Sequence, residues 1–489
     1  MVCDDPDRVE GLLRAFRQGL AGRDVLAELR EGSIGKGRMV PGPFGDHPLL
    51  YADYVASGRA LAQVEGFVLE EVLPFYANSH TEASYCGGFM TRLRRQARSA
   101  IAALCGADQD YAVIFAGSGA TAGINRLVTL LGVGEAVSRG QTVRVILGPY
   151  EHHSNLLPWR ESGAEVIELD EAPGGGPDEN ALRRALDAPA DLVVCAMTAA
   201  SNVTGVLTDV ARVTRIVKER GALMVWDYAG AGPYVPIAMR PAPDCAIDAM
   251  VVSPHKFIGG PGASGVMIVR RDAVRASRPS WPGGGTVRFV SPTRHDYSDA
   301  VEVREEAGTP NVIGDIRAAL AFLVKDAIGR DVISARNDVL VERAMSFWSG
   351  IPNLELLGNA AHPRLPIFAF RIGDGRGGHV HQQLITRMLS DRFGIQARGG
   401  CACAGPYAHR LLSIDAAASE RMRQAILHGD ELEKPGFTRL NFSVLMSDSE
   451  VSFILDAVAT LARDAPDFVR HYDADPCRAV FSPKAKNTA

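Results

Sequence analysis

The sequence lacks the features that would place the protein in a membrane or on a nucleic acid. Among its 489 residues no uncharged apolar run approaches the ~18 residues that a membrane-spanning helix needs. The formal net charge is only -5 and the pI is near 6.2, so we expect no binding to nucleic acid or to an anionic membrane. The first residues are acidic, whereas a secretion or transit signal would be basic, and we therefore expect a cytoplasmic protein.

Cysteine is also scarce. The eight cysteines, at positions 3, 86, 105, 195, 245, 401, 403 and 477, are too few for a disulfide framework in a chain of this length. Only Cys401 and Cys403 lie close together in the sequence. The sequence has no repeats and no low-complexity tract, so ordinary packed domains are expected.

What the sequence does contain is an alternation of short apolar runs and amphipathic helical patterns. Such runs, separated by helices, indicate a mainly parallel sheet covered on both faces. We therefore predict an α/β fold whose ligands lie at the carboxyl ends of the strands. The predicted strands are Tyr111–Phe115, Val143–Leu147, Asp191–Met197, Ala222–Trp226, Ala249–Ser253 and Gly265–Val269. The predicted helices include Val9–Glu31, Arg59–Tyr76, Thr121–Leu131, Asn180–Leu186, Val210–Arg220, Asp315–Ala327, His379–Arg392 and Glu450–Arg463.

The length of the chain exceeds what one hydrophobic core supports. We expect a helical N-terminal extension over residues 1–50, a large domain over 51–314 and a smaller α+β C-terminal domain over 315–489. The polar and helical stretch Ile414–Pro435 is typical of an insertion.

A glycine turn, Gly117-Ser118-Gly119-Ala120-Thr121, lies between a predicted strand and a predicted helix. The backbone N–H groups of such a turn and the positive end of the helix suit a phosphate. An ordinary tight turn with a threonine cap would have the same sequence. The segment alone leaves both interpretations open.

An acid and a lysine follow two further strands. Asp227 comes directly after one apolar run, and Lys256 comes just after another. The ends of parallel strands face one crevice, so Lys256 can form an imine with a carbonyl cofactor while Asp227 pairs with a pyridine nitrogen. Ser253 and His255 flank the lysine and offer donors to a phosphate. The plainer interpretation is a helix cap at Asp227 and a solvated Lys256.

Two more polar segments follow predicted strands. His152, within Glu151-His152-His153-Ser154-Asn155, offers an imidazole that can stack on a flat cofactor. Asn202, within Ser201-Asn202-Val203-Thr204-Gly205, follows the next strand. A lone histidine or asparagine at such a position is usually structural. Five polar segments that all follow strand ends instead indicate a shared site.

The order of these motifs resembles the class V aminotransferase family of fold-type I pyridoxal-phosphate (PLP) enzymes, and within it the cysteine desulfurase and selenocysteine lyase branch. The resemblance runs from about Tyr51 to about Arg463 and implies a large domain with a seven-stranded, mainly parallel sheet. The segments that carry it are Tyr51-Ala52-Asp53, Asn78-Ser79-His80, Gly119-Ala120-Thr121, Gly123-Ile124-Asn125, Glu151-His152-His153-Ser154-Asn155-Leu156-Leu157-Pro158-Trp159, Ser201-Asn202-Val203, Asp227, Ser253-Pro254-His255-Lys256, Glu306-Ala307-Gly308-Thr309-Pro310-Asn311 and Arg439-Leu440-Asn441-Phe442-Ser443.

The resemblance implies a role for each matched residue. Lys256 would carry PLP as a Schiff base, Asp227 would pair with its ring nitrogen, and His152 would stack on the ring. Arg439 would bind the substrate α-carboxylate, for which a planar guanidinium is suited, and Arg398 would also contact the substrate. The remaining implied cofactor ligands are Gly119, Ala120, Thr121, Ser253 and His255 at the phosphate, Asn202 by the phenolic oxygen and the substrate, and Thr309 reaching the phosphate of the neighbouring subunit in a homodimer.

The segment Arg398-Gly399-Gly400-Cys401-Ala402-Cys403-Ala404-Gly405-Pro406 resembles the short cysteine loop of group II desulfurases. Cys403 aligns with the sulfur-accepting cysteine of that loop, and Cys401 does not. A thiolate near an arginine in a glycine-rich loop is suited to nucleophilic attack. Two other interpretations stay open: a metal bound by Cys401, Cys403 and His409, or cysteines that only pack.

Three positions depart from the desulfurase pattern. Gly230 stands where a glutamine is usual, Thr81 where an arginine is usual, and Cys401-Ala402 replaces a pair of histidines. These changes bear on specificity for cysteine rather than on PLP chemistry.

The resemblance therefore implies an enzyme that converts L-cysteine to L-alanine and leaves a persulfide on Cys403 for an acceptor protein or small molecule. A C–S or C–Se lyase, an epimerase or an aminotransferase acting on another amino acid would keep the same PLP residues. A non-catalytic domain that has only kept the fold would not need Asp227, Lys256 and Arg439 together.

Overall fold

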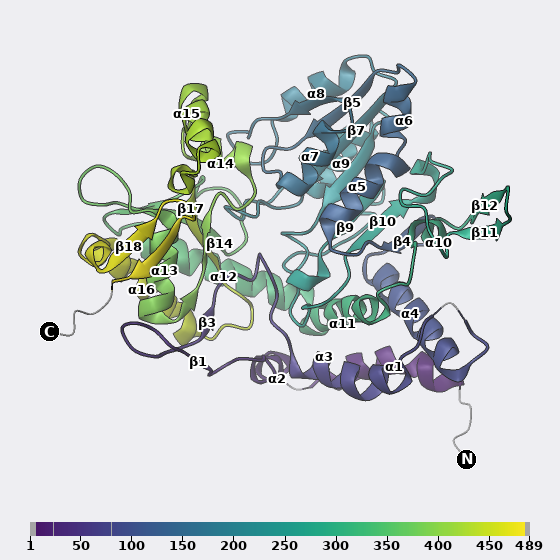
Figure 1. The fold of residues 1–489 in the computed structure, drawn as a ribbon, viewed down its shortest axis with the longest axis horizontal. Helices are drawn as coiled ribbons and strands as arrows, with labels where there is room; N and C mark the ends of the chain where they lie inside the picture. The colour runs from purple at the N-terminus through teal and green to yellow at the C-terminus, as the bar shows by residue number, and fades with distance from the viewer. Residues whose placement is uncertain (1–5, 23, 80, 485–489) are drawn as a thin grey trace. The chain divides into compact units, whose positions relative to one another are not determined.

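The computed structural model describes residues 6–22, 24–79 and 81–484, and within them the chain forms two compact units (Figure 1). Unit 1 contains the residues up to 34, 56–200 and 208–333, and unit 2 contains 35–55, 201–207 and the residues from 334 on. These boundaries differ from the predicted divisions after residues 50 and 314. His80, part of a motif used above, and Cys3 lie outside the described residues.

A seven-stranded sheet forms the centre of unit 1, with the strand order β4-β10-β9-β8-β7-β5-β6. Neighbouring strands from β6 through β5, β7 and β8 to β9 run parallel, whereas β10 is antiparallel to both of its neighbours. The predicted mainly parallel sheet is thus confirmed, although β6 was not predicted. The strands are β4 (Tyr111–Phe115), β5 (Val143–Leu147), β6 (Glu165–Glu168), β7 (Leu192–Thr198), β8 (Leu223–Asp227), β9 (Ala249–Val252) and β10 (Val266–Arg270).

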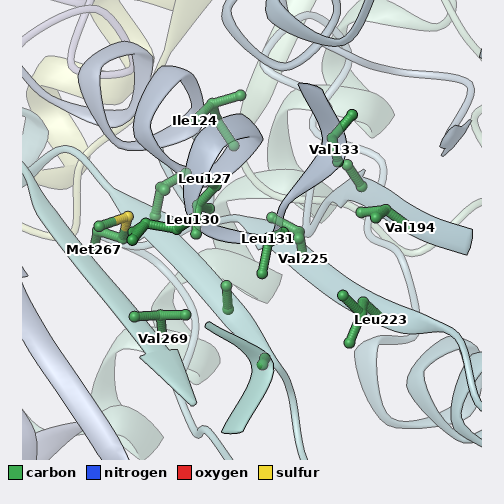
Figure 2. Close-up of a cluster of buried hydrophobic side chains, with 14 of the residues drawn as sticks. Ile124, Leu127, Leu130, Leu131, Val133, Val194, Leu223, Val225, Met267 and Val269 are labelled. Carbon is green, nitrogen blue, oxygen red and sulfur yellow. The ribbon is translucent and has the colours of Figure 1, made fainter. Parts of the chain in front are cut away.

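Alternate residues of these strands build a continuous apolar core on one face of the sheet. Figure 2 shows Val225 and Val269 from the strands facing Ile124 and Leu127 from helix α5 (Ala120–Leu130). Side chains two residues apart on a strand point to the same face, so this alternation follows from the apolar runs. Burying one such side chain contributes about 1.5–3 kcal/mol.

The opposite face is covered as well. There Trp226 of β8 donates its indole N–H to the hydroxyl of Thr214 on α9 (2.9 Å). The other helices of unit 1 are α1 (Pro6–Gly19), α2 (Val25–Glu31), α3 (Ala62–Phe67), α4 (Tyr85–Leu104), α6 (Val133–Ser138), α7 (Leu157–Arg160), α8 (Glu179–Asp187), α9 (Val210–Lys218), α10 (Val301–Glu305) and α11 (Val312–Ile328). None of the helices in the described ranges is long and apolar enough to cross a membrane.

Two predicted helices differ in the structure. The pattern Val9–Glu31 forms two helices, because Asp24 caps a new one by accepting the N–H of Ala27 (3.0 Å). The pattern Arg59–Tyr76 begins as α3, continues as a π-helical turn over Val68–Val72 and ends as a 3-10 turn that contains Pro74. Proline has no N–H to continue an α-helix, which explains that ending.

Helix α11 was predicted to open the small domain, but it belongs to unit 1. Its Asp315 pairs with Arg94 of α4 (2.6 Å), and most of its residues are buried. An amphipathic pattern shows that a helix packs on something, but the sequence does not show on which part of the chain.

Unit 2 contains a four-stranded antiparallel sheet in the order β13-β14-β17-β16. Its core includes Trp348, whose ring lies 5.3 Å from that of Phe368 and 6.2 Å from that of Phe442. The principal elements are α12 (Arg330–Trp348, which begins in unit 1), β13 (Leu354–Leu356), β14 (Ile367–Ile372), α13 (Gln382–Phe393), β16 (Arg398–Gly400), α14 (Gly405–Leu411), α15 (Ala416–Leu427), β17 (Phe437–Asn441), α16 (Asp448–Phe468), β18 (Tyr472–Asp475) and β19 (Val480–Pro483).

The predicted insertion forms α15 and a 3-10 turn over Glu431–Glu433. The N–H of Glu431 donates to the carbonyl of Pro476 in the turn of the β18–β19 hairpin (2.9 Å). The insertion and the hairpin therefore support each other.

The packing of α5 on the sheet gives a test of the fold. A Cβ added to Gly123 would lie 2.6 Å from Cγ1 of Val251 on β9, so Gly123→Ala should destabilise the protein by about 1–3 kcal/mol. This loss should appear although alanine favours a helix by about 1 kcal/mol over glycine. Denaturant unfolding measures the change, with Gly134→Ala of α6, which meets no atom within 4 Å, as the matched control. Equal free energies of unfolding for the two variants would contradict the close packing of Gly123 on Val251.

Candidate active site

The acid and the lysine lie at the ends of adjacent parallel strands, as the sequence predicts. Asp227 is the last residue of β8 and is level with Val251 of β9. Lys256 ends a 3-10 turn, Pro254–Lys256, that follows β9 directly. Because β8 and β9 run parallel, both residues emerge at the same edge of the sheet.

Asp227 is a buried carboxyl, only 2% exposed. Burial raises its pKa, while a hydrogen bond from the N–H of Ala229 (2.7 Å) and the positive charge of Lys256 lower it. The net direction is upward, so the carboxylate is poorly compensated where it lies. A cationic group brought next to it would be stabilised.

The glycine turn lies close against Ser253 and His255, and these residues together are called the cradle. Gly119 has a φ of +111°, and a Cβ there would lie 2.9 Å from Oγ of Ser253 and 3.0 Å from Cε1 of His255. The hydroxyl of Ser253 accepts the N–H of Ala120 (3.0 Å). Glycine is thus required for conformation and for space, and the two segments predicted to hold a phosphate lie together.

The cradle offers donors rather than charge. Helix α5 begins at Ala120 with Gly119, which has no side chain to cap it, as its N-cap, so the positive end of the helix at this turn suits an anion. Burial and the neighbouring charge of Lys256 lower the pKa of His255, which favours a neutral imidazole that donates one N–H.

His152 is linked to this cradle through Ser154. The hydroxyl of Ser154 lies 2.6 Å from Oγ1 of Thr121 and 3.0 Å from Nδ1 of His152. Nδ1 also accepts the N–H of Ser154 (3.1 Å), so the proton of a neutral ring is on Nε2. The ring is therefore held in one orientation and one tautomer.

The residue before His152 anchors this loop. Glu151 is buried and accepts the side-chain N–H of Asn155 (2.5 Å) and the backbone N–H of Thr198 at the end of β7 (2.9 Å). Burial raises the pKa of Glu151 to about 8, despite these donors and with a further contribution from the charge of Asp227. The sequence motif contained Glu151, but nothing in its type alone indicated this role.

In unit 2 one acid holds both predicted substrate arginines. Arg398 on β16 and Arg439 on β17 are cross-strand partners. The two oxygens of the buried Asp53 pair with them separately, at 3.0 Å to Arg398 and 2.8 Å to Arg439. Asp53 was predicted only as part of a family motif. Its function in positioning depends on contacts distant in the sequence.

Asn202 and the turn over residues 401–404, called the cysteine turn, belong to the same network of hydrogen bonds. Arg439 donates to the carbonyl of Asn202 (2.9 Å), and the side-chain amide of Asn202 donates to the carbonyl of Ala402 (2.8 Å). Oδ1 of Asn202 is buried and has no hydrogen-bond partner within the described ranges. Residues 201–207, which lie inside the predicted large domain, are therefore part of unit 2.

Cys403 is exposed at the tip of a tight turn, whereas Cys401 is half-buried. Ala402 and Cys403 have φ values of 52° and 54°, and the N–H of Ala404 donates to the carbonyl of Cys401 (3.1 Å), as in a type I′ turn. A left-handed conformation costs a non-glycine residue about 1–3 kcal/mol. The bond from Asn202 to Ala402 helps to hold it.

The remaining predicted positions are placed as follows. The ring nitrogens of His409 contact the carbonyl of Gly405 (2.8 Å) and the hydroxyl of Ser419 on α15 (3.0 Å), so both already have partners. Thr309 is exposed on unit 1. Of the departures from the family pattern, Gly230 is buried in the turn that follows β8, and Thr81 is exposed.

The buried Glu151 predicts a pH dependence. Above its ordinary pKa of 4.5 the unfolded chain loses this proton, while the folded protein keeps it up to about pH 8. Its contribution to stability should therefore decline as the pH rises from about 5 to 8, by up to about 1.4 kcal/mol per pH unit. Urea unfolding of wild type and Glu151→Gln across this range measures the effect. The difference in free energy between the two proteins should change with pH, and parallel curves would refute the assignment.

Known proteins resemble this chain over most of its length. The model of the class V aminotransferase family matches residues 50–452. A cysteine desulfurase of Pectobacterium carotovorum is 33% identical over 375 residues, which is 73% of this chain and 85% of that protein. A cysteine desulfurase of Enterobacter sp. is 30% identical over 364 residues, with the same coverage of each chain.

Solved structures agree. A cysteine desulfurase of Thermococcus onnurineus NA1 has a TM-score of 0.70 at 23% identity, over 85% of this chain and 95% of that chain. The S-sulfonic acid form of the Escherichia coli cysteine desulfurase CsdA has a TM-score of 0.69 at 22% identity, over 88% and 97%. These likenesses confirm the predicted fold-type I architecture. Together with the family match they show that the chain belongs to the class V aminotransferase family.

Proposed function

We propose that the protein is a PLP-dependent cysteine desulfurase, which converts L-cysteine to L-alanine and receives the sulfur on Cys403. The observation that carries the proposal is the hydrogen-bond path in unit 2 from Arg439 through Asn202 to Ala402. It ties an arginine suited to a substrate carboxylate to the turn that exposes the acceptor thiol. An aminotransferase or an epimerase has no need of that thiol.

The residues of unit 1 fit PLP. The cradle at Gly119, Ser253 and His255 has the donors and the close backbone approach that a phosphate needs. The poorly compensated Asp227 fits a protonated ring nitrogen, and His152 offers a ring of fixed orientation. When bound through Lys256, PLP would supply an electron sink for the carbanion at the substrate Cα.

The protein groups would then act as follows. Arg439 binds the α-carboxylate, and the buried Oδ1 of Asn202 accepts a hydrogen bond from a donor on the substrate or the cofactor. The amine of Lys256, released when the substrate binds, takes the Cα proton as a general base. The Cys403 thiolate attacks the substrate sulfur, so an S–S bond forms as the Cβ–S bond breaks. Protons returned to the remaining carbon skeleton give alanine.

The exposure of Cys403 makes a sulfur bound there accessible. A persulfide at the tip of a turn is accessible to a second thiol, on an acceptor protein or a small molecule, by the chemistry of thiol–disulfide exchange.

The first test is alanine and sulfide formation from L-cysteine in the presence of a dithiol. Cys403→Ser should lower both rates at least about 100-fold, because the variant has no nucleophile for the substrate sulfur. The absorption band of the bound cofactor should persist, since Cys403 is not among its ligands. Cys477→Ser, which changes another exposed cysteine, is the matched control and should match wild type.

If wild type makes no alanine although its cofactor spectrum is intact, the desulfurase proposal fails. A lyase, epimerase or aminotransferase that acts on another amino acid would then be the better proposal. If wild type and Cys403→Ser make alanine equally fast, Cys403 is not the acceptor.

We also propose that the enzyme is a homodimer. Unit 1 has a two-stranded ribbon, β11 (Val287–Val290) and β12 (His295–Tyr297), whose strands pair only with each other among the described elements (Figure 1). It exposes Phe289 (55%) and Val290 (61%), and Trp281 before it is 69% exposed. A ribbon with exposed apolar side chains fits contact with a second subunit.

The segment that carries Thr309 is well anchored for such a contact. Its first residue, Glu306, pairs with Arg94 (2.6 Å) and Arg98 (2.8 Å) and accepts the N–H of Phe115 (2.8 Å). Its last residue, Asn311, caps α11 by accepting the N–H of Gly314 (3.2 Å). An exposed threonine held at both ends fits a ligand of a neighbouring active site.

Mixed dimers test this arrangement. Lys256→Ala and Thr309→Ala homodimers should each be impaired, the first without a base and the second with weaker cofactor binding. A dimer with one subunit of each kind should recover about half of the wild-type activity, because one site then has both Lys256 and the partner's Thr309. Differently tagged subunits, co-expressed and purified in two steps, allow the measurement. No recovery would mean that Thr309 serves the site of its own subunit.

A further inference from the structure

The cysteine turn holds a second thiol that the proposed sulfur transfer does not use. Cys401 stands two residues before Cys403, at a position where a histidine is usual in the resembling loops. Ala402 separates the two cysteines, and its carbonyl is held by the side chain of Asn202 (2.8 Å). The turn is closed by the N–H of Ala404 on the carbonyl of Cys401 (3.1 Å).

The bend of this turn is compatible with a disulfide between the two cysteines. Consecutive Cα atoms are about 3.8 Å apart, and a chain that bends back at a left-handed residue brings the Cα atoms of positions i and i+2 to roughly 5.5 Å. Disulfides span Cα distances of about 4.4–6.8 Å. Ala402 and Cys403 both have positive φ, so the bend lies directly between the two thiols.

The two thiols also differ in exposure. Cys403 is exposed, as a group that meets substrate and acceptor must be, whereas Cys401 is half-buried. A thiol that is half-buried but adjacent to the persulfide is better placed to attack it than to meet an external partner. This is the arrangement of a resolving cysteine beside a reactive one.

We propose that Cys401 resolves the Cys403 persulfide, an inference that rests on the proposed function. The Cys401 thiolate attacks Sγ of Cys403 and forms a Cys401–Cys403 disulfide. The bond between Sγ of Cys403 and the outer sulfur breaks, and the outer sulfur leaves with the electron pair and its hydrogen as hydrosulfide. The outer sulfur is thereby reduced and the Cys401 sulfur oxidised, as in thiol–disulfide exchange. A small dithiol then reduces the disulfide and restores both thiols.

This step determines the form in which sulfur leaves the enzyme. Without Cys401 the persulfide waits for an acceptor that can reach Cys403. With Cys401 the sulfur leaves as free hydrosulfide, so the reaction that consumes it is one that takes an inorganic sulfide. The disulfide closes a small ring in an already strained turn, and strained disulfides are readily reduced.

A single turnover without reductant tests the step. Trypsin cleaves after Arg398 and Arg410 and so gives a peptide, residues 399–410, that contains Cys401 and Cys403 and no other cysteine. After one equivalent of L-cysteine, the wild-type peptide should be lighter by two hydrogens, and free sulfide should appear. In Cys401→Ser the peptide should be heavier by one sulfur, and the sulfide released should fall at least about tenfold until a dithiol is added.

Cys401→Ala gives a second variant in case serine disturbs the turn, and Cys477→Ser should behave as wild type. A wild-type peptide that keeps the extra sulfur as long as the Cys401 variants do would overturn the proposal.

A second arm separates this inference from the desulfurase proposal. Sodium tetrasulfide loads sulfur on thiols without any cysteine cleavage. The folded wild-type protein, desalted after this treatment, should give the disulfide peptide, and Cys401→Ser and Cys403→Ser should each give a persulfide peptide only. That result would support the resolving thiol even if L-cysteine is not the substrate. A persulfide retained on the wild-type peptide would refute it.

Discussion

The burial of one carboxylate, Asp227 at the end of β8, is the physical constraint on which the site in unit 1 depends. Asp227 lies at the carboxyl edge of the sheet and is buried. Because burial removes water from the charged carboxylate, ionisation is disfavoured and the pKa of Asp227 is raised. Two neighbours stabilise the charge of Asp227 in part, Lys256 by its positive charge and Ala229 by its N–H. A cation bound beside Asp227 would stabilise the charge further. In the proposed function, the phosphate of PLP would lie in the neutral cradle and its cationic ring nitrogen at this acid, so the two ends of the cofactor would each meet a fitting group.

Much of unit 1 was predictable because a parallel sheet is specified locally. The continuous apolar runs that form β4 and β5 were predicted to the residue. Asp227 and Lys256 were predicted at strand ends because two other apolar runs, those of β8 and β9, stop just before them. The edge strand β6 was missed, since Glu165–Glu168 is short, half-buried and bounded by charges. The role of Glu151 was missed for another reason: its partner Thr198 belongs to a different strand, and no local pattern reveals that pairing.

The site residues of unit 2 were predicted one by one, but their connection was not. Asp53, Asn202 and Arg439 come from three distant parts of the chain, and two bonds of Arg439 join them. Local propensity contains no information about such long-range contacts, which is why the predicted domain divisions differ from the two compact units at residues 201–207 and at α11. The family resemblance supplied the residues, and only the structure supplied the network.

The strain of the cysteine turn explains why that network is needed. Left-handed backbone at both Ala402 and Cys403 is costly, so an isolated turn of this sequence would relax and move the thiol. The amide of Asn202 counters this by holding the carbonyl between the two cysteines, and Arg439 in turn holds Asn202. The same guanidinium is the group suited to a substrate carboxylate. A carboxylate bound at Arg439, as the proposed function requires, would act on the support of the turn, so that proposal couples substrate binding to the position of Cys403.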